Sequence, residues 1–333
     1  MAYKIGIPKA MLYYDYFPLW DLFFKELGAK VIVSPDTNKE ILDKGVTHCV
    51  DESCLPVKIF HGHVYYLKDK VDFLFIPKIM SVCRKDYFCP KILGLPEMIK
   101  NSFDELPEII GTTVNLYKGN NNIKKSVLEI GTKITPDLFK VRRAYNSSTK
   151  VFKEYKNLIN KKIISIEGVK TQSRTLKDIN SLHDKKKRTI MMVGHPYNIY
   201  DNYINMNLAY KLVKNNVKVI TSETIDENKI LFYSSKLPKR MFWTYGKRII
   251  GSSFCAIEEG LCDGMIYISS FGCGMDSILV DLIERKAKEK MVPFMLITVD
   301  EQTGEAGINT RIEAFLDMMM WRDRDENNIS TLG

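Results

Sequence analysis

Two cysteines stand where the sequence predicts the start of a helix. Cys273 lies in the stretch SFGCGMDS, after the apolar run GMIYISS and before a segment whose apolar residues recur at helical spacing. Cys54 lies two residues before Pro56, and proline favours the first turn of a helix. Because a helix N-terminus stabilises negative charge, both positions suit a thiolate or an anionic cluster bound by one.

Two further thiols, Cys83 and Cys89, follow the apolar run VDFLFIP in the stretch SVCRKDYFCPK. We expect this loop to leave the carboxyl end of a strand, the edge at which open parallel sheets bind ligands. The spacing does not choose between the two thiols. Nearby basic residues could meet coenzyme A phosphates or an acidic partner, although solvation explains them equally well: Lys78, Arg84, Lys85 and Lys91.

The spacing of the cysteines disfavours zinc. Structural zinc sites use closely spaced cysteine pairs, whereas the nearest pairs here are separated by four and five intervening residues. Thiolates scattered over strand-end loops could instead hold a cubane iron–sulfur cluster. Buried packing is the alternative for every cysteine, and it is our expectation for Cys49, Cys255 and Cys262.

The composition predicts an ordinary globular protein. The chain has 333 residues, of which 45% are hydrophobic and 27% charged, enough for two medium cores. No apolar run approaches the roughly 20 residues that span a bilayer, and the N-terminus lacks a long apolar segment, so we expect a cytoplasmic protein without membrane contact. Seven cysteines, an odd number, argue against a disulfide framework.

The net charge of +9 is concentrated in one segment rather than spread over a surface. Much of the excess lies between Lys161 and Arg188, a stretch that contains no aromatic residue. Base-stacking aromatics are usual in nucleic-acid sites, so we interpret the segment as a solvated connector and expect no nucleic-acid partner.

Short apolar runs alternate with helical patterns in two separate parts of the chain. This alternation predicts an α/β fold with parallel sheets covered on both faces. We divide the chain into an N-terminal α/β lobe (1–134), a helical connector (135–187) and a C-terminal α/β lobe (188–333). Sites are expected in the cleft between the carboxyl edges of the two sheets.

Two polar residues at predicted strand ends are candidates for chemistry. His195 follows the run TIMMV and could donate a hydrogen bond to a substrate or a cluster, or serve the backbone instead. Glu301 follows the run PFMLITVD, and a carboxylate near a cluster could handle a substrate proton. Solvation is the alternative for it and for its neighbours Asp300, Glu305 and Arg311.

The sequence carries no phosphate-cradling signature. It has no Walker loop, no GxGxxG turn after a strand and none of the phosphate loops of an actin-like ATPase. We therefore expect that this chain does not hydrolyse ATP.

Six blocks resemble the acyl-CoA dehydratase activase-related family, whose relatives include 2-hydroxyacyl-CoA dehydratase subunits and double-cubane cluster proteins. They are GIPKAMLYYDYFPLW, DESCLPVKIFHGHV, YFCPKILGLPEMI, VGHPYNIYDNYINM, SFGCGMDS and TVDEQTGEAGINTRIEAF. The blocks are spread from Gly6 to Phe315, so the resemblance extends over nearly the whole chain. The resemblance implies two Rossmann-like lobes and an oxygen-sensitive 4Fe-4S cluster, single or linked as a double cubane. The family's cysteines fall on Cys54, Cys89 and Cys273, with Cys83 as an alternative to Cys89.

The resemblance also implies an external ATP-dependent activase that supplies electrons at low potential. Two functions follow. In the first, the chain is an enzyme component that reduces or dehydrates a small substrate, such as a 2-hydroxyacyl-CoA. In the second, it is a non-catalytic electron-transfer or cluster-carrying partner. A homodimer or a pair with a similar subunit is expected, because closed two-fold assemblies dominate.

Overall fold

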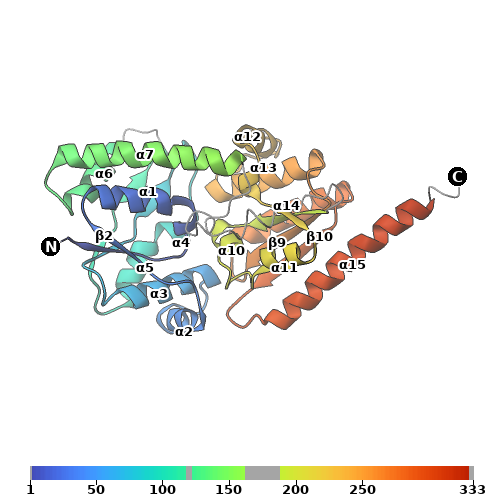
Figure 1. The fold of residues 1–333 in the computed structure, drawn as a ribbon, viewed down its shortest axis with the longest axis horizontal. Helices are drawn as coiled ribbons and strands as arrows, with labels where there is room; N and C mark the ends of the chain where they lie inside the picture. Colours follow the sequence, from blue (N-terminus) through green and yellow to red (C-terminus); the bar gives the residue numbers. More distant parts are fainter. Residues whose placement is uncertain (1, 118–121, 162–187, 330–333) are drawn as a thin grey trace.

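The computed structural model describes residues 2–117, 122–161 and 188–329 (Figure 1). The first lobe is built on a parallel sheet of four strands in the order β2-β1-β3-β5. A short parallel pair, β4 with β6, forms a separate sheet in the same lobe. These strands are β1 (Lys4–Ile7), β2 (Lys30–Val33), β3 (Phe73–Phe75), β4 (Lys78–Ser81), β5 (Glu108–Ile110) and β6 (Thr113–Asn115).

The second lobe repeats this topology. Its four parallel strands have the order β10-β9-β7-β8, so in each lobe the first strand lies between the second and the third. The strands are β7 (Thr189–Gly194), β8 (Lys218–Ile220), β9 (Gly264–Ser270) and β10 (Phe294–Val299). Every residue of β9 is buried, as expected for a central parallel strand covered on both faces. The predicted α/β class with two parallel-sheet lobes is confirmed.

Helices connect the strands in both lobes. The first lobe contains α1 (Tyr13–Glu26), α2 (Lys39–His48), α3 (Leu55–Leu67), α4 (Pro90–Leu93), α5 (Leu95–Ser102) and α6 (Ile123–Thr132). The second contains α10 (Pro196–Tyr200), α11 (Leu208–Lys214), the 3₁₀ turn η2 (Ser222–Thr224), α12 (Glu227–Ser234), α13 (Thr244–Glu258), α14 (Gly274–Glu289) and α15 (Glu305–Ile329). None of the described helices is long and apolar enough to cross a bilayer.

One long helix, α7 (Leu138–Lys161), falls in the predicted connector. It packs along α1 and α6 and reaches η2 of the second lobe (Figure 1). The rest of the connector, 162–187, lies outside the described residues. The domain boundaries at 134 and 187 stay predictions.

The stretch PEIIGTTVN forms two strands in different sheets. β5 pairs with β3 and β6 pairs with β4, and Gly111 and Thr112 stand between them. The chain therefore changes sheets within two residues, which alternation of apolar residues alone does not signal.

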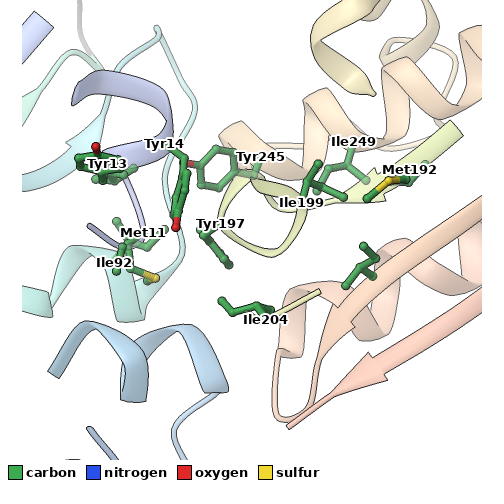
Figure 2. Close-up of a cluster of buried hydrophobic side chains, with 14 of the residues drawn as sticks. Met11, Tyr13, Tyr14, Ile92, Met192, Tyr197, Ile199, Ile204, Tyr245 and Ile249 are labelled. Carbon is green, nitrogen blue, oxygen red and sulfur yellow. The ribbon is translucent and has the colours of Figure 1, made fainter. Parts of the chain in front are cut away.

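Buried hydrogen bonds join the two lobes. The hydroxyl of Tyr14 on α1 donates to Asp201 at 3.1 Å, and the hydroxyl of Thr37 donates to the same carboxylate oxygen at 2.5 Å. In the opposite direction, Tyr245 of α13 donates to Asp15 of α1 at 2.5 Å. Figure 2 shows Tyr14 facing the side chains of Tyr197 and Tyr245 across the junction. Each lobe thus has an aspartate that accepts a hydrogen bond from a tyrosine hydroxyl of the other lobe.

This junction makes stability depend on pH through His63. Its Nε2 lies 3.0 Å from the hydroxyl oxygen of Thr37, and burial, aided by the charge of Lys9, lowers the pKa of His63 to about 3. The unfolded chain therefore binds a proton near pH 6.5 that the folded chain does not bind. Stability present at neutral pH is lost as the pH falls.

We expect His63 alone to lower the free energy of unfolding by up to about 1.4 kcal/mol for each pH unit below 6.5. In His63→Gln the slope should shrink, although His61, whose pKa is also lowered by burial, keeps part of it. Urea unfolding at pH 7 and pH 5 measures both slopes. Equal slopes in the two proteins would contradict this assignment.

Candidate functional site

The three predicted cysteines each occupy the position directly before a helix. Cys54 precedes α3, Cys89 precedes α4 and Cys273 precedes α14, and all three have an extended backbone. Prolines at the start of α3 and α4 fit this local structure, because the first helical turn needs no donor there. At Cys54 and Cys89, the helix start is therefore indicated by a proline within two residues of the cysteine.

Turns from both lobes bring these cysteines together. Gly272, with φ of +74°, turns the chain before Cys273 so closely that an added Cβ would lie 4.0 Å from the Cα of Cys54. The same Cβ would lie 3.7 Å from the backbone oxygen of Glu52, and Lys91 of α4 donates to that oxygen at 3.1 Å. The turns that carry Cys54, Cys89 and Cys273 therefore meet.

Tyr197, on the first turn of α10, lies near enough to all three thiols for their charges to act on it. Burial raises the pKa of Tyr197 well above its usual range, and the charges of all three thiols add to the shift. Burial also raises the pKa of Cys54 and of Cys89, while backbone N–H groups at the start of α3 and α4 act against it. Each of these two thiols thus faces N–H donors of its own helix.

The loop before Cys89 is fixed by the second lobe. Tyr87 donates its N–H to the carbonyl of Phe242 at 2.8 Å and accepts from the N–H of Thr244 at 2.8 Å. Next to it, the fully buried carboxylate of Asp86 pairs with Arg240 and Lys247 of the second lobe. Cys89 is therefore held against the junction from both sides.

Cys83 takes a different place from Cys89. It is exposed, and its pKa is raised, first by partial burial of the thiol, with the charges of Lys247 and Asp86 acting in opposite directions. The structure groups Cys89, rather than Cys83, with Cys54 and Cys273. The remaining cysteines are Cys255 and Cys262, both buried in the core, and Cys49, half-buried at the end of α2.

His195 follows β7 directly and lies beside Cys273 on the neighbouring strand end. β7 and β9 are adjacent parallel strands, and the order of the sheet reverses between them, which is where open α/β sheets bind ligands. The Nε2 atom of His195 lies 3.9 Å from the sulfur of Cys273 and 3.2 Å from Oδ1 of Asp276. Both His195 and Asp276 are almost completely buried.

The His195–Asp276 contact is a buried ion pair. Burial opposes the charge on the imidazole, but the carboxylate of Asp276 and the hydrogen bond to it raise the pKa of His195 to about 10. In turn, His195 and the hydroxyl of Tyr267, which donates to Asp276 at 2.6 Å, hold the pKa of Asp276 below its usual value against the effect of burial. The carboxylate of Asp276 therefore favours the protonated form of the imidazole.

Sequence reasoning missed Asp276 and Tyr197. Asp276 stands three residues after Cys273 at a helix start, the spacing of a capping box, and this signal could have found it. Tyr197 lies on a short helix after His195, and nothing local distinguishes it from a packing residue.

Glu301 lies on the loop after β10 and forms an ion pair with a residue of the first lobe. Its Oε1 atom is 2.6 Å from the ammonium of Lys58 on α3, whose side chain is only 4% exposed. Its predicted neighbours make separate contacts. Asp300 caps its own turn through Thr303, Glu305 pairs with Lys211, and Arg311 donates to the carbonyl of Leu296.

One protein-family model matches most of the chain. The model described as a CoA enzyme activase uncharacterised domain (DUF2229) matches residues 4–225, two thirds of the 333 residues. The chain belongs to this activase-related family. No curated protein matches the chain at a significant level. The matched region contains Cys54, Cys89 and His195 and ends before Cys273.

The position of His195 in this activase-related chain depends on Gly194. Gly194 has φ of +151°, and an added Cβ would lie 2.5 Å from the carbonyl oxygen of Ile268 on β9. We expect Gly194→Ala to lower the free energy of unfolding by roughly 3 kcal/mol, because it adds backbone strain and a clash inside the sheet.

Gly260→Ala is the matched control, since Gly260 also has a positive φ, +62°, but an added Cβ meets nothing within 4 Å. It should cost only about 1 kcal/mol of left-handed strain. Urea midpoints of the two variants decide the comparison. Equal losses would show that the close approach of β7 to β9 is not the cause.

Proposed function

We propose that this chain is an iron–sulfur component of an acyl-CoA dehydratase-type system. In this proposal Cys54, Cys89 and Cys273 bind a 4Fe-4S cluster, single or as part of a linked double cubane. An ATP-dependent activase supplies low-potential electrons, and a small substrate such as a 2-hydroxyacyl-CoA is reduced or dehydrated in the cytoplasm. The observation that carries the proposal is the convergence of three helix-start cysteines around Tyr197.

The chemistry of these donors fits such a group. Three thiols from two lobes lie close enough for their charges to add at one buried hydroxyl. Burial raises the pKa of Cys54 and of Cys89, so their thiolates are costly unless a cation offsets their charge. Thiolates near N–H donors are the usual ligands of iron–sulfur clusters, which supply one-electron transfer when bound.

The surroundings of the thiols support access from outside. Cys89 and Cys273 are half-buried, and Phe271, directly before the Gly272 turn, is 69% exposed. Electrons could therefore enter from a docked protein over a short path. Glu301 and Lys58 are the candidate groups for handling a substrate, because their ion pair joins α3 to the loop after β10.

The shallow position of the thiols also favours the alternative function, a non-catalytic electron-transfer or cluster-carrying partner. The two differ in whether the chain binds an acyl-CoA. Both require the cluster, and in both we propose a homodimer or a pair with a similar subunit.

A single metal ion is the competing site chemistry. His195, Cys273 and Asp276 offer one nitrogen, one sulfur and one oxygen within 4.8 Å of one another, a donor set that zinc accepts. To bind, His195 would have to lose the proton that its ion pair with Asp276 retains. A metal ion bound by these three residues would also not use Cys54 or Cys89, although both lie near Cys273. We therefore favour the cluster.

Metal analysis tests the proposal. Protein purified without oxygen should be brown, contain about four irons and matching acid-labile sulfide per chain, and bleach in air. Cys54→Ala, Cys89→Ala and Cys273→Ala should each lose the iron, because each removes one of three thiolate ligands.

Cys83→Ala, Cys49→Ala and Cys262→Ala are the matched controls and should keep the iron. Colourless protein with one zinc per chain would support the competing site instead. If all six variants keep the iron content of the wild type, the assignment of Cys54, Cys89 and Cys273 as ligands is wrong.

A second test concerns the electron donor. We expect no ATP hydrolysis by the purified chain, because its sequence lacks phosphate-cradling motifs. Mixed anaerobically with a reduced activase, it should show cluster reduction by electron paramagnetic resonance only when ATP is present. Equal cluster reduction with and without ATP, or ATPase activity of the purified chain, would contradict the proposal that an external ATP-dependent activase supplies the electrons.

A further inference from the structure

We propose that His195, held in place by Asp276, donates a hydrogen bond to the sulfur of Cys273 and thereby raises the reduction potential of the group bound there. The inference rests on the proposed function, since it concerns the same thiols. It assigns His195 a positioning role at the metal centre instead of acid–base work on a substrate.

The geometry leaves Nε2 as the donor. This atom faces two acceptors, the sulfur of Cys273 at 3.9 Å and Oδ1 of Asp276 at 3.2 Å. A proton on Nε2 is the arrangement that satisfies both contacts, whether the ring is neutral or charged. The N–H therefore points at the junction between the carboxylate and the thiol.

Packing prevents the ring from turning away. The imidazole stacks on Tyr197 with centroids 5.0 Å apart and planes 6° apart, and the ring of Tyr245 meets it at 5.3 Å and 78°. Asp276 is fixed in turn by the hydroxyl of Tyr267. The donor is thus preorganised by side chains from β9, α10, α13 and α14.

The same burial argues against a catalytic role for His195. Its exposed fraction is 0%, and the ring is enclosed by aromatic side chains. A general acid or base must come within hydrogen-bond reach of the proton that it transfers. His195 reaches the sulfur of Cys273 but not the surface.

The three thiols receive their donors in two different ways. For Cys54 and Cys89, backbone N–H groups at the start of α3 and α4 act against the rise in pKa that burial causes. For Cys273 the donor is a side chain, which a substitution can remove. Hydrogen bonds to the sulfurs of an iron–sulfur centre stabilise the added negative charge of the reduced state, so losing one makes reduction harder.

Two variants isolate this bond. His195→Phe keeps a ring to stack on Tyr197 and removes the donor, whereas His195→Gln keeps an N–H donor. The double variant His195→Phe with Asp276→Asn removes the ion pair as a unit, so that no unpaired charge is left in the interior. His63→Gln, which alters a buried histidine bonded to Thr37, is the control.

The experiment is an anaerobic redox titration followed by electron paramagnetic resonance, with iron and sulfide measured on every sample. At a fixed potential, we expect the reduced-to-oxidised ratio to fall at least tenfold in His195→Phe and in the double variant, which is about 59 mV for one electron. His195→Gln should recover part of the shift, and His63→Gln should titrate as wild type.

Wild-type potentials in iron-loaded His195→Phe and in the double variant would overturn the inference and leave the proposed function standing. Loss of iron from both would also overturn it, in favour of His195 as a ligand. An iron-free wild type would remove the proposed function and the inference together.

Discussion

The arrangement of the site depends on the parallel pairing of β7 with β9. This pairing sets Gly194 opposite Ile268, so the two strands end side by side and the residues that follow them, His195 and Cys273, come within contact distance. A residue with a Cβ at Gly194 would push the strands apart where their ends must meet. Asp276 then closes the arrangement from the first turn of α14.

Much of this could be read from the sequence because the signals were local. The glycines around Cys273 and the proline after Cys54 predict turns that lead into helices, and the structure has helices at both places. At Cys89 the sequence predicted only a loop, and the structure adds the short helix α4 directly after it. The choice of Cys89 over Cys83 could not be read, since it depends on contacts of the intervening loop with α13. The ion pair of Glu301 with Lys58 joins residues 243 positions apart and leaves no local pattern.

Buried polar contacts help to fix how the lobes meet. Asp86 has no solvent exposure and pairs with two cations of the other lobe, while Asp201 accepts hydroxyl groups from α1 and from Thr37. Burying a charge is costly unless its partners are in position, and removing one partner leaves the other unpaired. Such contacts tolerate one relative orientation of the lobes, which apolar packing alone does not enforce.

The division of the three cysteines between the lobes has a thermodynamic consequence. Cys54 and Cys89 belong to the first lobe and Cys273 to the second, so whatever binds all three acts as a cross-link between the two lobes. By mass action, such a ligand favours the docked state of the lobes and no other. Its measured affinity then includes the cost of docking, and any mutation that weakens the junction will look like a defect in ligand binding, even far from the thiols.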